Sequence, residues 1–545
     1  MSEVLKSQAG FGSPRFDTGA WSLRSYLPAA LPVFGALLML ALRIQLGSGH
    51  FIDDSALMML ALACYLTAAT FHLLNLYAPS DMAQRAGLWL GSLGVFFNFS
   101  SWLVRWVAAR DREIEIFVRQ SRSLADLPWV FRYIPFSNLY DLSLAFAFGA
   151  GITTMLISGR KNYRFLGAFS LPLAALILVL ARFIGSELIN LQPVLDSYWR
   201  PIHVGIASLS YGVALVCFAA AVIYLLKDGV KPESMAICAA IFGLAVFATI
   251  SRYSVFWPST FGTYTASTVV GESRMPLDLR ADIPYVGWLL ALAGLALLGM
   301  IVAFGQYLRR QSEAARVWGH RLLRFSIIVQ AIAIGVLVWQ VKSMNNVLAH
   351  IDTRQYEHFS TTMLRQEMEQ QQLPGEEIQA RLAQFTPQQL NTMATNWVAE
   401  NGSALRLSTN ANPVELSALI TVFVATLFIL FFSFRTDKLR AALPSAERLD
   451  SLMYKTASVA FAGLAMLLIT GAIWANESWG HYWQWDSKET GAFVAWLTYG
   501  GFLHARISRG LRGRRAAYFA VVAFLLVIFT YLGVSYLLPG LHSYA

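Results

Sequence analysis

Long apolar runs separated by short polar segments dominate this sequence. A helix needs roughly 20 residues to cross the hydrocarbon core of a bilayer, and thirteen runs approach that length. They lie near residues 27–46, 55–77, 87–108, 139–158, 164–184, 201–226, 234–250, 284–307, 325–343, 415–434, 456–475, 489–505 and 516–539. The pattern predicts an all-α polytopic membrane protein with about 13 transmembrane helices.

The charges support this prediction and indicate how the chain is oriented in the membrane. Only 14% of the residues are charged, against about a quarter in soluble domains. Arginines cluster in alternate loops, most densely within 309–324 and 506–515, as in the cytoplasmic loops of membrane proteins. We therefore predict the N-terminus inside and the C-terminus outside. The same loops account for the net charge of +10, so this charge does not indicate a nucleic-acid partner.

Two further features limit the choice of chemistry. Cys64, Cys217 and Cys238 all lie in apolar runs without a Cys-x-x-Cys spacing, which argues against a disulfide framework, a zinc site or a thioredoxin-like motif. We assign no catalytic residue. The one long polar segment, 344–413, is rich in Gln and Glu. It contains Thr386-Pro387, a typical helix start, so we expect a small, mostly helical external subdomain.

The most informative stretch, residues 474–490, joins two predicted spans on the outer face. Within twelve residues it holds a tyrosine and four tryptophans, Trp474, Trp479, Trp483 and Trp485. Such aromatics could be an interfacial belt at headgroup depth. Their concentration in one loop, beside fixed acids, instead favours a platform for a flat, π-rich ligand such as haem.

This loop closely resembles the WWD signature of the haem-handling protein family, which includes CcmC, CcmF and CcsA. Its ending, Asp486-Ser-Lys-Glu-Thr490, is similar to the Asp-Pro-Lys-Glu-Thr of CcsA (ResC). Two segments, 193–211 and 540–545, resemble the CcsA segments that carry two external histidines. The segments 135–140 and 443–450 also fit. Ser487, Gly491 and His481 depart from the usual signature.

The resemblance covers roughly 90–230 and 435–545, and it implies four parts. We expect an extra N-terminal transmembrane pair over 1–80 and a first CcsA-like part with His203 over 81–233. Inserted transmembrane helices with the external subdomain would occupy 234–434, and a CcsA-like part with the WWD signature would occupy 435–545.

Nine histidines are the candidate iron ligands. His203 and His542 flank the aromatic loop on the predicted outer face, and two imidazoles can ligate haem iron; a hydrogen-bonded interfacial histidine is the alternative. By resemblance, His504 is a transmembrane ligand. His72 lies at a comparable predicted depth, so it either pairs with His504 on a second haem or hydrogen-bonds a neighbouring helix.

The other polar candidates are weaker. His481 either contacts a haem propionate or only replaces a serine. We expect His320 to be solvated, and assign no ligand role to His50, His350 or His358. Asp486 and Glu489 are expected to cap the following helix and to fix the loop through hydrogen bonds, with the ligand as a further donor.

The resemblance implies the haem-handling subunit of a cytochrome c synthase (haem lyase). It would bind and export haem b and present it at the Trp loop between two histidines. Expected partners are a CcsB/ResB-like membrane protein, apocytochrome c with its Cys-x-x-Cys-His segment, and thiol-reducing proteins. The expected location is the bacterial inner membrane, with the loop on the periplasmic face. Two alternatives stay open: a haem transporter or chaperone without ligation activity, and an unrelated multi-span transporter whose Trp loop is an interface anchor.

Overall fold

The structure, a computed structural model, describes most of the chain. The described residues are 23–47, 51–119, 123, 125, 127, 129–184, 188, 195–250, 263–270, 277–282, 285–343, 356–370, 374–401, 405–407, 414–433 and 436–533.

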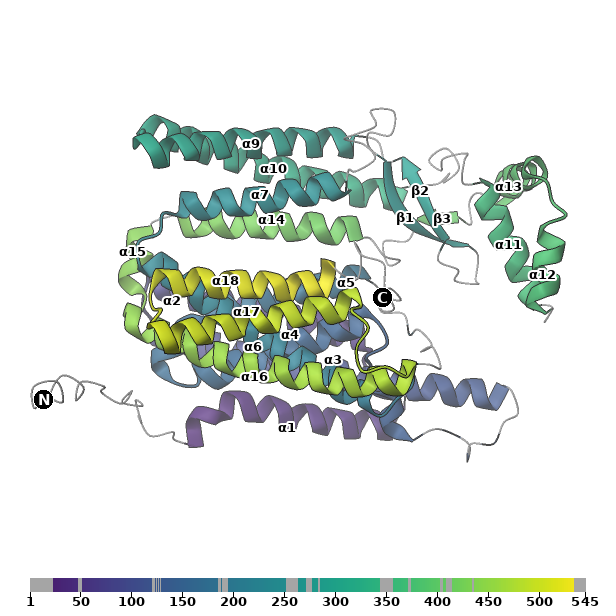
Figure 1. Ribbon diagram of the computed structural model, residues 1–545, viewed down its shortest axis with the longest axis horizontal. Helices are drawn as coiled ribbons and strands as arrows, with labels where there is room; N and C mark the ends of the chain where they lie inside the picture. Colours follow the sequence, from purple (N-terminus) through teal and green to yellow (C-terminus); the bar gives the residue numbers. More distant parts are fainter. Residues whose placement is uncertain are drawn as a thin grey trace, which may run out of the picture.

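Long, roughly parallel and antiparallel helices form two neighbouring groups (Figure 1). The larger group contains α1 (Leu23–Leu46), α2 (Asp54–Tyr77), α3 (Asp81–Arg119), α4 (Leu139–Ser158), α5 (Gly167–Ile184), α6 (Trp199–Lys227), α16 (Ala446–Trp479), α17 (Ser487–Arg509) and α18 (Arg514–Ile528), with a π-helical turn at Phe529–Gly533. The smaller group contains α7 (Pro232–Ile250), α9 (Val286–Arg310), α10 (Glu313–Ser343) and α14 (Val414–Ser433).

The predicted fold class is confirmed, since every predicted apolar run falls on a helix. Ten of the described helices are long and apolar enough to cross a membrane, and two shorter apolar helices lie at Pro232–Ala245 and Val422–Ser433. The protein is therefore a multi-pass membrane protein. The count of thirteen spans and the inside–outside orientation stay predictions.

Each helix group has its own core of buried apolar side chains. The groups meet where Phe169 of α5 stacks on Phe432 of α14, with ring centroids 4.8 Å apart. The short helix α15 (Thr436–Ala442) adds polar contacts, since Arg440 donates to the carbonyls of Leu226 and Val230, both at 2.9 Å. The smaller group is thus fixed to the end of α6.

Within the segment 344–413, the described residues include the helices α11 (Tyr356–Gln370), α12 (Gly375–Leu382) and α13 (Pro387–Asn401), and that this segment is an external subdomain stays a prediction. Thr386 caps α13, because its Oγ1 accepts a hydrogen bond from the Gln389 amide at 3.3 Å. A small antiparallel sheet was not predicted. Its order is β2-β1-β3, with β1 at Thr263–Val270, β2 at Leu277–Asp282 and β3 at Leu405–Leu407. These elements lie at the same end of the bundle as the α16–α17 connection (Figure 1).

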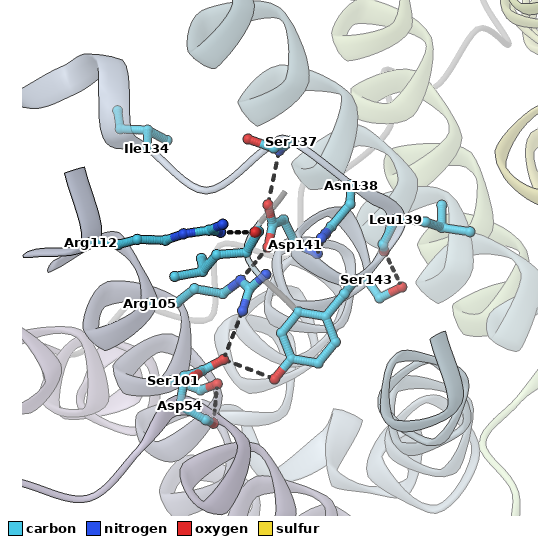
Figure 2. Close-up of polar contacts among 12 residues, drawn as sticks. Asp54, Ser101, Arg105, Arg112, Ile134, Ser137, Asn138, Leu139, Asp141 and Ser143 are labelled. Atoms are coloured by element: carbon cyan, nitrogen blue, oxygen red, sulfur yellow. Dashed lines mark hydrogen bonds and ion pairs between the residues drawn. The ribbon is translucent and has the colours of Figure 1, made fainter. Parts of the chain in front are cut away.

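A buried charge cluster ties three helices together at that end (Figure 2). Arg105 of α3 has a side chain only 1% exposed, and it donates to Asp141 of α4 and lies 3.4 Å from a carboxylate oxygen of Asp54 of α2. Tyr140 also donates to Asp54, at 3.0 Å. In turn Asp141 accepts from the Ser137 amide at 2.9 Å. The cluster therefore fixes the segment that leads into α4.

Candidate functional site

A cavity of about 140 Å³ lies where the start of α4 and α6 meets the end of α16 and the start of α17. Its lining includes an imidazole, three tryptophans and two cations: His203, Trp474, Trp479, Trp483, Arg200 and Lys488. The segment 136–139, which the Arg105 cluster holds, forms one wall. The sequence candidates from two distant parts of the chain thus come together around one space.

His203 is held in one orientation by α16. Its Nδ1 lies 2.9 Å from the Leu467 carbonyl oxygen. A carbonyl only accepts, so Nδ1 carries a proton, and in the neutral ring Nε2 then carries the lone pair. This is the tautomer that a metal-ligating imidazole needs, with the second-shell acceptor that usually accompanies it. Gly471 makes room for the ring, because a Cβ there would lie 2.7 Å from His203 Cε1.

Two of the four tryptophans lie on a helix rather than in a loop. Our expectation of a loop from Trp474 onward is wrong, because α16 continues without a breaker to Trp479 and ends at Gly480, which has φ +78°. Trp474 is buried, and its ring centroid lies 5.6 Å from that of His203 and 6.1 Å from that of Trp479. The helix therefore sets these two rings beside the imidazole.

The other two tryptophans point to different places. Trp483 lines the cavity, whereas Trp485 is 68% exposed and lines a second hollow between α17 and α18. Trp485 has φ +58°, a left-handed conformation that is uncommon for a bulky residue. The two rings meet edge to face at 5.6 Å. Strained backbone of this kind often occurs at functional sites.

Asp486 and Glu489 form a capping box at the start of α17, which confirms the predicted helix cap. The Asp486 carboxylate accepts from the Lys488 amide at 3.0 Å. Glu489 accepts from the Asp486 amide at 3.3 Å and from the Gln484 amide at 3.0 Å. The two acids thus fix the backbone that carries Trp483 and Trp485.

Replacing Asp486 with alanine is expected to destabilise the protein by about 0.5–2 kcal/mol, the usual effect of losing such a cap. It should also make Trp483 and Trp485 more accessible to an aqueous fluorescence quencher. Asp53→Ala is the matched control, since Asp53 caps α2 through the Ala56 amide at 2.8 Å. This control should lose similar stability and leave quenching unchanged; equal quenching in both variants would contradict the role of Asp486 in holding the loop.

The two cations of the lining, Lys488 and Arg200, were not among the predicted site residues. Lys488 precedes the predicted span 489–505 and lines the cavity. Burial lowers the pKa of its ammonium group to about 8, while Asp486 acts in the opposite direction, so the group is mostly charged at neutral pH. Arg200 is 2% exposed and donates to the Arg132 carbonyl at 2.7 Å. Lys488 lies inside the Asp-Ser-Lys-Glu-Thr motif, which could have drawn attention to it.

The chemistry of this lining fits a haem, with an imidazole for iron, aromatic rings for the macrocycle and cations for its carboxylates. The volume of the cavity is smaller than that of typical ligand pockets, which is about 300–1,000 Å³. Its outer side is formed by Trp479 and by the 62% exposed Tyr482. A macrocycle would therefore fit only when the loop at 480–485 is displaced outward.

The remaining histidine candidates lie elsewhere. His504 is on an exposed face of α17, where its Nδ1 is 3.4 Å from Ser508 Oγ. His481 is exposed in the loop. His542, His50 and His350 lie outside the described residues.

His72 is buried between α3 and α5. A Cβ on Gly87 would lie 3.1 Å from its ring, and one on Gly167 would lie 2.4 Å away. The space that a macrocycle would need beside this ring is therefore filled by two helices. Whether His72 ligates a haem or hydrogen-bonds a neighbouring helix stays a prediction.

Sequence comparison matches the family described as Cytochrome C assembly protein over residues 136–271 and 413–542, somewhat less than half of the chain. The matched segments contain the cavity's histidine and all four tryptophans, and the apolar helices make the class a multi-pass membrane protein. Over these segments the chain is similar to the Cytochrome C assembly protein family, in agreement with the resemblance. The matched residues include both ends of the segment 234–434, which was predicted to be inserted, and leave 272–412 unmatched.

Curated relatives carry the same assignment. The chain is 57% identical over 98 residues to the Cytochrome c biogenesis protein CcsA of Prochlorococcus marinus (strain MIT 9515), covering 18% of this chain and 31% of that protein. It is 51% identical over 102 residues to the protein of that name in Parasynechococcus marenigrum (strain WH8102), covering 19% and 33%. The alignments thus span about a third of the length of these relatives.

Proposed function

We propose that this chain is the haem-handling subunit of a cytochrome c synthase. It would bind haem b in the cavity beside His203 and present it for covalent attachment to apocytochrome c. The observation that carries the proposal is the His203 tautomer, fixed by the Leu467 carbonyl within a lining of three tryptophans. The family of the two matched segments supports it.

Each part of the lining has a role in this proposal. The lone pair on Nε2 of His203 ligates the iron on one side, and His542 is proposed as the opposite ligand. Trp474 and Trp479 on α16, with Trp483 from the loop, provide flat apolar surfaces for the macrocycle. The Lys488 ammonium pairs with a haem carboxylate. The Asp486 and Glu489 cap holds the start of α17, beside the loop that moves outward when the macrocycle enters.

Haem is the cargo of the proposed reaction, and the reactive thiols belong to the other substrate. The two thiols of the apocytochrome Cys-x-x-Cys-His segment add across the haem vinyl groups, and its histidine replaces one of this chain's ligands. This chain then needs no cysteine pair of its own. Thiol-reducing proteins would keep the apocytochrome cysteines reduced, because the thiolate is the nucleophile.

We also propose a membrane partner. His504 is exposed on α17, where an ionisable side chain in lipid is costly unless another group covers it. A CcsB/ResB-like protein packed on this face would bury His504 and supply the opposite iron ligand of a transmembrane haem. The proposed location of the complex is the bacterial inner membrane, with the Trp loop on the periplasmic face.

Reconstitution separates this function from its alternatives. The purified chain, a CcsB/ResB-like partner, haem and reduced apocytochrome c should yield covalent thioether-linked haem. Haem binding without thioether formation would favour a transporter or chaperone. A purified protein without any haem spectrum would favour an unrelated transporter and reject the proposal.

Trp483→Ala is expected to lower haem occupancy by roughly fivefold to tenfold, in line with about 1 kcal/mol for loss of an aromatic stacking contact plus buried area. The low-spin spectrum of the remaining haem should not change, because stacking and iron ligation are separate contributions. Trp288→Ala on α9 is the control, since Trp288 is 71% exposed and lies outside the cavity. A changed axial-ligand spectrum in Trp483→Ala would contradict this division of roles.

A further inference from the structure

Another pocket lies in the smaller helix group, between the first turns of α10 and the last turns of α14. Its volume is about 450 Å³. One side is cationic and the other apolar; the main residues are Arg316, His320, Arg324, Leu427, Leu430 and Phe431. Arg316, His320 and Arg324 are spaced by four residues, so they lie along one face of α10.

A buried carboxylate positions two members of this face. Glu233 of α7 is 2% exposed and accepts from Arg316 Nε at 2.8 Å. Its Oε1 also lies 3.2 Å from His320 Nε2. The expectation that His320 is solvated is therefore wrong, because the helix fold brings Glu233 beside it. Glu233 and Glu313 both pair with Arg316 and balance its charge.

Arg324 has no such balance. Within the described part of the chain it makes no hydrogen bond or ion pair, and it is exposed two turns farther along α10 than Arg316. The facing end of α14 contributes only apolar residues and Ser433 to the pocket. Glu313 at the rim is 70% exposed and pairs with Arg316, while Arg309 and Arg310 end α9 nearby in sequence. An arginine at the edge of the apolar layer requires a counter-anion or water.

The surface beyond the cations is apolar and faces outward. Phe325, Ile328 and Ile332 of α10 and Phe431 of α14 are each between 45% and 58% exposed. Trp318, 57% exposed near the start of α10, is the residue type favoured at headgroup depth. Cations at an interface, followed by an exposed aliphatic strip, are complementary to a phosphate group followed by acyl chains.

We propose that this pocket binds the headgroup of an anionic phospholipid. The phosphate lies against Arg324, since guanidinium groups bind phosphate through paired, charge-assisted hydrogen bonds. The acyl chains lie along the exposed strip of α10 and α14. Basic pockets between transmembrane helices are known to select such lipids. The lipid would also stabilise the contact between α10 and α14, and the proposal is independent of haem binding.

The test uses the full-length protein, purified and delipidated in detergent. It is titrated with phosphatidylglycerol, and separately with phosphatidylcholine of the same acyl chains, and bound lipid is counted by native mass spectrometry. Phosphatidylglycerol should bind more tightly than phosphatidylcholine. Arg324→Gln should weaken phosphatidylglycerol binding by roughly fivefold, the contribution of one arginine near an anionic lipid. Phosphatidylcholine binding should not change.

Arg321→Gln is the matched control. Its guanidinium lies 5.2 Å above the Trp318 ring and does not line the pocket, so the affinity should stay within about twofold of the original. Equal losses in Arg321→Gln and Arg324→Gln, or equal affinity for the two lipids, would overturn the proposal. Competition by inorganic phosphate alone, in the same titration, would identify a soluble anion as the ligand and also reject the lipid.

Discussion

Replacing His203 with glycine is expected to lower the haem that copurifies with this protein by roughly 10–100-fold. Loss of an outer-shell partner of a metal ligand already has an effect of that size, and the variant loses the ligand itself. The remaining haem should lose its six-coordinate low-spin spectrum. Added imidazole should restore part of both, because it can enter the space left by the side chain.

Two companion variants make this result specific. His481→Gly removes an exposed histidine from the same loop region, and it should keep the haem content and the spectrum. His542→Gly tests the proposed opposite ligand in the same way. If haem content and spectrum are the same in the His203 and His542 variants as in the original protein, the ligand assignment is wrong.

Replacing Arg105 with methionine is expected to destabilise the protein by about 3–5 kcal/mol, the usual cost of removing one partner from a buried ion pair. The change leaves the carboxylates of Asp54 and Asp141 close together without a cation. It should also loosen the segment 136–139, because Asp141 holds the Ser137 amide. The measurement is the midpoint of unfolding in mixed detergent, followed by helical circular dichroism.

Arg110→Met provides the matched control on the same helix. Arg110 is exposed, and such surface changes usually stay within about 0.5 kcal/mol. The double variant Arg105→Met, Asp141→Leu should recover part of the stability, since it removes a buried charge together with its partner. A midpoint for Arg105→Met equal to that of Arg110→Met would show that the cluster does not hold these helices together.

The hydrophobic pattern was sufficient to predict the helices, because each backbone N–H and C=O group inside a bilayer must form its hydrogen bond within its own segment. The Trp loop was found from its residue types and spacing, whereas His203 was found from its predicted position and from the resemblance of 193–211 to a CcsA segment. Where a helix ends was harder. The continuation of α16 to Trp479 could not be read from hydropathy, since the final turns leave the apolar layer while remaining helical.

Contacts between distant segments could not be predicted from the sequence. The pairing of Val270 with Leu405 joins strands that are separated in the sequence by α9, α10 and α11–α13, and no local pattern encodes it. The ion cluster of Arg105 joins residues on three helices, and the exposed face of His504 depends on which helices pack beside α17. Each of these contacts is set by tertiary packing, which the pattern along a single sequence does not encode.

The buried charge cluster also has a consequence for how this gene could change over time. Asp141 lies in the first matched segment, whereas Arg105 and Asp54 belong to helices that precede it. A deletion that trimmed the gene to its matched segments would leave an unneutralised carboxylate against neighbouring helices. We therefore expect descendants of this gene to lose the N-terminal helices only together with a substitution at position 141, so that the two regions are inherited as one unit.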